Sequence, residues 1–195
     1  MPVLPTVPVP ASEPDEQPVF FYDLGDPGCY LAAEQIISSL PVVPEWEPVL
    51  AAQLQPELLS GADRDEIVRR ARQLALQPVR WPESWPPDTR PAMLAATYAK
   101  RIGRVVAFSL AAFRQAFAAG RDLGDRETIL IAGAACEMHP SAILKAISTR
   151  AVSDALAQAT HRARHAGVSA LPAVQIADRL FTGEAALAEA AKVLR

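Results

Sequence analysis

Apolar and polar positions alternate in a way that predicts a buried strand near the start of the chain and a helix directly after it. The apolar run Val19–Tyr22 is typical of a strand that is covered on both faces. An amphipathic segment then predicts a helix over about 28–39, with Asp26 as its N-cap. Positions 46–50 predict a second strand, which we place towards the edge of a sheet because Pro48 has no amide hydrogen to donate.

The middle of the chain is predicted to be helical throughout. Apolar residues recur at helical spacing within 63–76, and 91–119 favours two helices jointed near Gly103. Asp125 is expected to cap a further helix, and Pro140 is expected to open another. No repeat period is visible, so this block is not predicted to be a solenoid.

The end of the chain returns to a mixture of helix and strand. A helix is expected over about 149–165, followed by strands at 173–176 and 180–182 that form a hairpin. A final helix is expected over 184–194. The predicted order is therefore β-α-β, a helical block, and then α-β-β-α.

This order is that of a thioredoxin-like fold interrupted by helices. We predict an α/β protein whose thioredoxin-like domain comprises residues 18–52 and 149–195, with an inserted all-helical domain at 53–148. Residues 1–17 are rich in proline and acidic side chains with little to bury, and are predicted to form a flexible tail.

Composition and charge narrow the classes of function. Half of the 195 residues are hydrophobic, which is enough for a core without disulfides or a metal. A formal net charge of −3 offers no electrostatic attraction to nucleic acid or to an anionic membrane, and no apolar run approaches the roughly 20 residues of a membrane span. Two cysteines are too few for a secreted disulfide framework, and the proline-rich start does not resemble a secretion signal. We therefore expect a cytoplasmic protein that binds neither nucleic acid nor membranes.

The turn Asp26-Pro27-Gly28-Cys29 is the main candidate for chemistry. A helix N-terminus lowers the pKa of a thiol in its first turn, which favours a reactive Cys29. An ionised Asp26 one turn away raises that pKa by a similar amount, on the order of a kcal/mol in free energy. Three interpretations stay open: a reactive monothiol, Asp26 as a general base or ligand-orienting group, or a simple N-cap beside a small buried cysteine.

Several motifs together resemble the DsbA-like superfamily, and in particular the 2-hydroxychromene-2-carboxylate isomerases and kappa-class glutathione transferases. The resemblance covers nearly the whole chain after the tail. It rests on four segments: Phe20-Phe21-Tyr22-Asp23 with the Pro-x-x-Tyr-Leu-Ala that follows, Thr89-Arg90-Pro91-Ala92 after a tryptophan–proline loop, Gly120 to Asp125, and Gly167 to Val174.

The resemblance implies roles for residues at the turn and near the end of the chain. Asp26 falls where the isomerases place a serine that hydrogen-bonds the glutathione sulfur and where the oxidoreductases place their nucleophilic cysteine. Cys29 falls where the oxidoreductases keep the resolving cysteine. The acid that grips the glutathione amino group in the family corresponds to Ala185, with Glu184 beside it as a substitute.

The same resemblance implies a ligand site at the Pro172 loop. Pro172 is cis in this fold, and this conformation leaves the backbone of Leu171 free to pair with an extended ligand. Trp81 and Trp85 are expected either to line a cleft between the insertion and the thioredoxin-like half or to anchor their loop.

Two further clusters favour structural roles. Cys136, Glu137 and His139 match no standard metal spacing, and we interpret them as a buried cysteine and a capping histidine, with no metal site. A Cys29–Cys136 disulfide is conceivable because the insertion covers the active face in this fold. The basic cluster from His161 to His165 is interpreted as favourable charge at a helix C-terminus.

Two functions of different classes follow. The first is a thiol-dependent oxidoreductase or a 2-hydroxychromene-2-carboxylate isomerase-like enzyme that acts on a small-molecule or thiol substrate through Cys29, Asp26 and the Pro172 loop. It would carry no covalently bound cofactor and would use glutathione or another low-molecular-weight thiol. The second is a non-catalytic binding module that keeps the cleft without the chemistry. The sequence leaves open whether the protein forms a homodimer.

Overall fold

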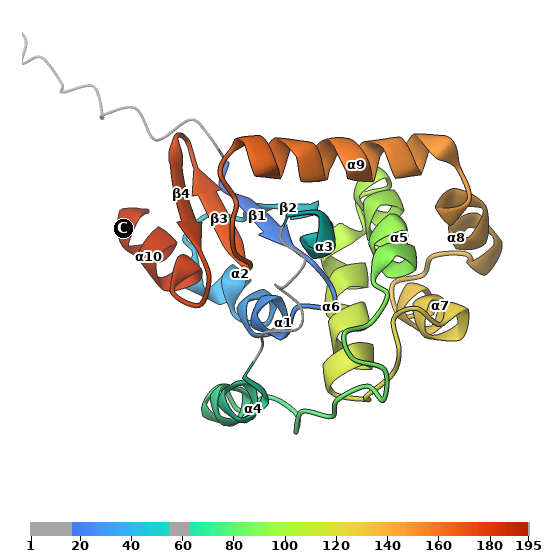
Figure 1. Cartoon of the computed structure of the whole chain (residues 1–195), viewed down its shortest axis with the longest axis horizontal. Coiled ribbons are helices and arrows are strands. Elements are labelled where there is room, and N and C mark those ends of the chain that lie inside the picture. The colour runs from blue at the N-terminus through green and yellow to red at the C-terminus, as the bar shows by residue number, and fades with distance from the viewer. Residues whose placement is uncertain (1–16, 55–62, 195) are drawn as a thin grey trace, which may run out of the picture.

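A four-stranded mixed sheet forms the centre of the thioredoxin-like part of the protein (Figure 1). The computed structural model describes residues 17–54 and 63–194, so the predicted tail at 1–17 lies almost wholly outside the described residues. The strands are β1 (Val19–Tyr22), β2 (Glu45–Pro48), β3 (Ala173–Ile176) and β4 (Arg179–Thr182). Their order is β2-β1-β3-β4, with β1 and β2 parallel and the other two pairs antiparallel. The α/β fold predicted from the sequence is confirmed, and β2 is an edge strand.

Three helices pack beside the sheet near the β1 turn, namely α1 (Pro27–Ala33), α2 (Ile36–Ser39) and α10 (Ala186–Val193). The prediction of one continuous helix over 28–39 is wrong. The side-chain Nε2 of Gln35 donates to the Leu31 carbonyl at 2.7 Å, and the Gln35 amide donates to Ala32 instead. The Gln35 amide thus bonds three residues back instead of four, and the α-helix is interrupted between Ala33 and Ile36.

The helical block between β2 and β3 contains one short helix, at 51–54, that was not predicted from the sequence, and it ends with the helix that was predicted to belong to the thioredoxin-like domain. It comprises α3 (Ala51–Leu54), α4 (Arg64–Gln73), α5 (Arg90–Arg101), α6 (Val105–Phe117), α7 (Arg126–Ala134), α8 (Pro140–Ile147) and α9 (Arg150–His165). Asp63 and Asp125 accept hydrogen bonds from first-turn amides of α4 and α7. The joint between α5 and α6 lies at Gly103, whose φ of +71° is in the left-handed region that glycine adopts without strain.

Buried aromatic side chains connect the sheet to the helical block. The phenol of Tyr22 on β1 lies 2.6 Å from the hydroxyl of Ser109 on α6, and both residues are fully buried. The Tyr22 ring also packs against Phe113 of α6, with ring centroids 5.9 Å apart. These contacts hold α6 against β1, which fixes how the helical block sits over the turn after β1. Among the described residues, no helix is both long and apolar enough to cross a bilayer.

Candidate functional site

The turn between β1 and α1 is built around the Asp26 carboxylate. Asp26 Oδ1 accepts a hydrogen bond from the Cys29 amide at 2.7 Å, and Pro27 occupies the first turn of α1. Asp26 is therefore the N-cap that its position predicts, because a carboxylate satisfies an amide that has no partner within the helix.

Cys29 is buried rather than presented to a ligand. Its exposed fraction is 0 %, and burial raises the pKa of its thiol well above the ordinary value, with the neighbouring charge of Asp26 acting in the same direction. Burial and the charge of Asp26 together therefore outweigh the helix dipole, which favours the thiolate of Cys29. The thiol stays protonated at neutral pH.

Asp26 is itself nearly buried, with an exposed fraction of 6 %. Burial raises the pKa of its carboxyl group from 3.8 to about 7, although the hydrogen bond from the Cys29 amide opposes that rise. The charge of Asp23 adds to the increase. A carboxyl group with a pKa near neutrality can both take up and give back a proton under physiological conditions.

Asp23 is a fully buried acid that the sequence interpretation did not select as a site residue. Its carboxylate accepts from the Gly25 and Ala51 amides at 2.9 Å and from the Thr89 hydroxyl at 3.3 Å. Burial raises its pKa to about 6. These bonds join the end of β1 to the starts of α3 and α5, so Asp23 positions the turn. The only sequence signal for this role of Asp23 was its place as an acid directly after a buried strand.

The Pro172 loop lies directly against this turn. The Leu171–Pro172 peptide bond is cis. A Cβ atom at Gly28 would lie 3.0 Å from Asp26 Oδ1 and 3.3 Å from Pro172 Cδ, with the Leu171 carbonyl oxygen at 3.9 Å. The Asp26 carboxylate, Gly28 and Pro172 are therefore close neighbours, and Gly28 and Pro172 are the two of them that line a groove.

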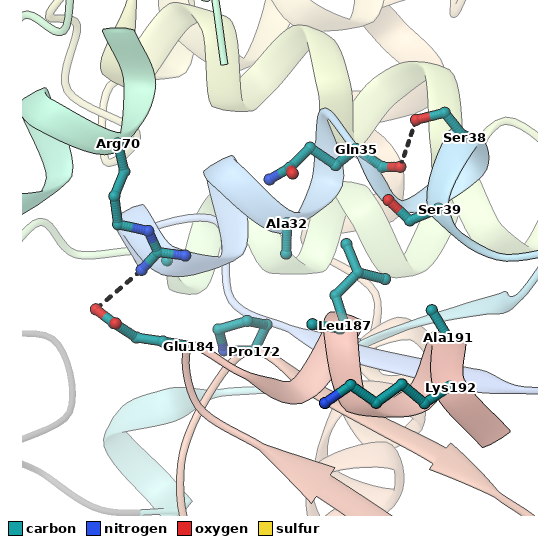
Figure 2. Close-up of a pocket in the computed structure, with 12 residues that line it drawn as sticks. Ala32, Gln35, Ser38, Ser39, Arg70, Pro172, Glu184, Leu187, Ala191 and Lys192 are labelled. Atoms are coloured by element: carbon teal, nitrogen blue, oxygen red, sulfur yellow. Dashed lines mark hydrogen bonds and ion pairs between the residues drawn. The ribbon is translucent and has the colours of Figure 1, made fainter. Parts of the chain in front are cut away.

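A groove of about 570 Å³ begins at Gly28 and Pro172 and runs between α1, α2 and α10 (Figure 2). Its rim carries an ion pair between Arg70 of α4 and Glu184, with Nη1 and Oε1 2.9 Å apart. The remaining lining is mostly small or hydroxylated: Ala32, Gln35, Ser38, Ser39, Leu187, Ala188, Ala191 and Lys192. The groove thus offers a cation, an anion and hydrogen-bonding groups close to the turn.

Of the residues predicted to bind a substrate, Pro172 and Glu184 line this groove. Leu171, which was predicted to pair with a ligand through its backbone, is buried, and its carbonyl oxygen lies on the side of Gly28. Trp81 and Trp85 pack edge to face with ring centroids 5.0 Å apart, and both contact Phe117. The tryptophans are part of a packed aromatic cluster on α6, under the guanidinium of Arg64.

The second cysteine lies apart from this groove. Cys136 is buried and, like Cys29, is a free thiol. His139 accepts a hydrogen bond from the Ser141 amide and caps α8, as predicted from its position. Within residues 17–54 and 63–194, no group of three or more histidine, cysteine, aspartate and glutamate side chains is arranged to hold a metal.

Comparison with known proteins gives a family and a fold. A model of the DSBA-like thioredoxin domain matches residues 19–195. No curated protein sequence matches the chain. A 2-hydroxychromene-2-carboxylate isomerase structure is similar with a TM-score of 0.80 at 15 % identity, covering 92 % of this chain and 94 % of that one. A probable DsbA oxidoreductase from Streptomyces coelicolor has a TM-score of 0.73 at 16 % identity, covering 91 % and 88 %.

A third similar structure is the cytosolic disulfide reductase DsbM from Pseudomonas aeruginosa with glutathione. It has a TM-score of 0.60 at 15 % identity and covers 85 % of this chain and 88 % of that one. At these identities, likeness to solved structures shows the fold alone. The family match spans nearly all of the described residues and agrees with the sheet order and with the resemblance noted in the sequence. The chain belongs to the DSBA-like thioredoxin domain family.

Proposed function

We propose that this protein is a thiol-dependent isomerase in which Asp26, rather than Cys29, handles the proton of a low-molecular-weight thiol such as glutathione. One observation carries the proposal. The Asp26 carboxyl group, with a pKa of about 7, lies beside Gly28 and Pro172, which line the groove, while the Cys29 thiol is fully buried.

The pKa of Asp26 suits it to exchange a proton with a thiol. A free thiol has a pKa of about 8.5 and is mostly protonated at neutral pH. Ionised Asp26 can remove that proton, and the resulting carboxylic acid can then donate a hydrogen bond to the thiolate. Because the proton moves to Asp26, the group that faces the thiolate is a neutral acid, which does not repel the sulfur. A serine can donate to a thiolate, but it is a much weaker base than Asp26.

An isomerisation can follow from reversible addition of that thiolate. The sulfur adds to an electron-poor double bond of the substrate, and the π electrons move onto the conjugated carbonyl. Rotation about the resulting single bond and loss of the thiolate give the isomer, and Asp26 returns the proton to the sulfur. The thiol is regenerated and nothing is oxidised or reduced, so no second cysteine is required.

The groove contains groups that suit a charged thiol compound. Arg70 and Glu184 carry opposite charges at the rim, and Ser38 and Ser39 lie further along the wall. Glutathione has both carboxylate and ammonium groups, which these side chains can pair with by exchanging their present partners. The glutathione-containing structure of DsbM, which has the same fold, is compatible with such a ligand.

The geometry gives less support to a disulfide oxidoreductase. Position 26 is an aspartate, so the turn has no cysteine pair, and Cys29 and Cys136 are both buried free thiols. A mixed disulfide at Cys29 would require its sulfur to become exposed and ionised. Both changes are opposed by the burial that raises its pKa.

A pair of variants tests the proposal. The full chain is assayed with glutathione for isomerisation of 2-hydroxychromene-2-carboxylate, next to Asp26→Asn and Cys29→Ala. Asn keeps the cap but cannot accept the proton, so we expect a rate at least about 100-fold lower, whereas Cys29→Ala should keep most of the rate. Loss of activity in Cys29→Ala with retention in Asp26→Asn would contradict the proposal. Glutathione binding without turnover in the unmodified chain would instead favour the binding module.

A further inference from the structure

Two histidines form a close pair on the last two turns of α9. His161 and His165 are both exposed, their ring centroids are 4.3 Å apart, and their Nε2 atoms are 3.2 Å apart. They are four residues apart and therefore lie on the same face of the helix. They share no residue with the groove at Gly28.

The distance between the two nitrogens matches that of two imidazoles bound to one metal ion. Imidazole nitrogens lie about 2.0–2.1 Å from Zn²⁺, which in tetrahedral geometry places two such nitrogens about 3.3 Å apart. Without a metal, the same contact is one N–H···N hydrogen bond, in which the tautomers of the rings decide which Nε2 donates. A metal ion between the nitrogens would take the place of that shared proton without requiring either ring to move far.

The surroundings of the pair also suit a cation. Both histidines lie at the C-terminal end of α9, where the helix dipole is negative. Two cationic neighbours on α9 are engaged elsewhere: Arg162 binds Glu47 Oε2 at 3.2 Å, and Arg164 donates to the Gln53 carbonyl. A hollow of about 440 Å³ beside the pair is lined by Ala157, Gln158, His161 and Arg162.

We propose that His161 and His165 form a binding site for a divalent transition-metal ion of the kind that imidazole prefers, namely Zn²⁺, Ni²⁺ or Cu²⁺. The ion takes two protein nitrogens and completes its coordination with water. Because positions remain open to solvent, the ion is exchangeable, and a small anion or a carboxylate can join it from the hollow.

Calorimetric titration of the untagged full chain with Ni²⁺ tests the site. We expect one equivalent to bind, and binding to be lost in both His161→Ala and His165→Ala. The matched control is His139→Asn, which removes the third histidine of the chain but keeps a side chain that caps α8. That variant should bind Ni²⁺ like the unmodified protein.

A second measurement needs no variant. Paramagnetic Ni²⁺ should broaden the imidazole NMR signals of two histidines and leave those of the third sharp. Absence of binding by the unmodified chain, binding that survives in either alanine variant, or broadening of all three histidines alike would overturn the proposal.

Discussion

Replacing Asp26 by Asn should make the protein more stable at neutral pH and change the pH dependence of its stability. The pKa of the Asp26 carboxyl group is raised from 3.8 to about 7 because the group is buried. The folded protein therefore favours the neutral carboxylic acid at position 26 more strongly than the unfolded chain does. The stability that this preference contributes is fully present below pH 3.8 and is lost as the pH rises through about 7.

The size of the effect follows from the two pKa values. One pKa unit corresponds to 1.36 kcal/mol, so a rise from 3.8 to about 7 corresponds to roughly 4 kcal/mol of stability lost between acid and alkaline pH. Asn keeps the hydrogen bond from the Cys29 amide and does not titrate. The free energy of unfolding of Asp26→Asn should therefore exceed that of the unmodified protein by a difference that approaches roughly 4 kcal/mol as the pH increases.

Urea denaturation of both proteins at several values from about pH 4 to about pH 8 measures this difference. Tryptophan fluorescence reports the transition, because Trp46 is buried in the core. Asp23 has a pKa raised to about 6 and titrates in the same range, but it is present in both proteins and largely cancels from the difference.

Stability curves that run parallel across this pH range would refute the burial argument for Asp26. A variant whose stability relative to the unmodified protein falls as the pH rises would also refute it, because that result would mean that the folded state prefers the ionised carboxylate. In the parallel case, the constant difference between the curves would measure only how well Asn caps the helix.

Three further changes test the groove and the contacts that hold the turn in place. Gly28→Ala puts a methyl group 3.0 Å from Asp26 Oδ1 and 3.3 Å from Pro172 Cδ, so glutathione affinity measured by calorimetry should fall at least several-fold; unchanged affinity would remove Gly28 from the ligand path. Tyr22→Phe loses the buried 2.6 Å hydrogen bond to Ser109 and should lower the free energy of unfolding, measured by urea denaturation, by about 1–3 kcal/mol. A decrease below about 0.5 kcal/mol would show that this bond does not hold α6 to β1. Glu47→Gln weakens the pairing with Lys100 and Arg162 and should lower the free energy of unfolding by about 1–2 kcal/mol. Asp154→Asn, in the exposed pair with Arg150, should change it by less than about 0.5 kcal/mol. Equal effects of the two variants would contradict the burial of Glu47 as the cause of the difference.

Local signals in the sequence predicted most of the fold. Asp26, Asp125 and Pro140 act on residues within one turn of themselves, so their positions define helix starts without reference to the rest of the chain. The apolar run at β1 and the hairpin of β3 and β4 depend on equally short patterns. The break at Gln35 could not be predicted in this way, because it depends on which carbonyl the Gln35 amide bonds to.

The candidate site was only partly predictable, because its properties depend on burial and on distant contacts. The sequence places Cys29 in the first turn of a helix but does not show that the thiol is fully buried, and burial is what decides its pKa. Arg70 reaches the groove from α4 and meets Glu184 near the other end of the chain. A pattern read along the sequence does not reveal such a pairing.

The rate of Cys29 alkylation across a range of pH, in a Cys136→Ala background, tests most directly whether Asp26 rather than the thiol is the reactive group at this turn. A buried, protonated Cys29 should react only as fast as the protein opens, with no ionisation step below the free-thiol value of about 8.5. Rapid alkylation of the folded protein with an apparent pKa below that value would show an accessible thiolate at Cys29 and contradict the assignment of the chemistry to Asp26.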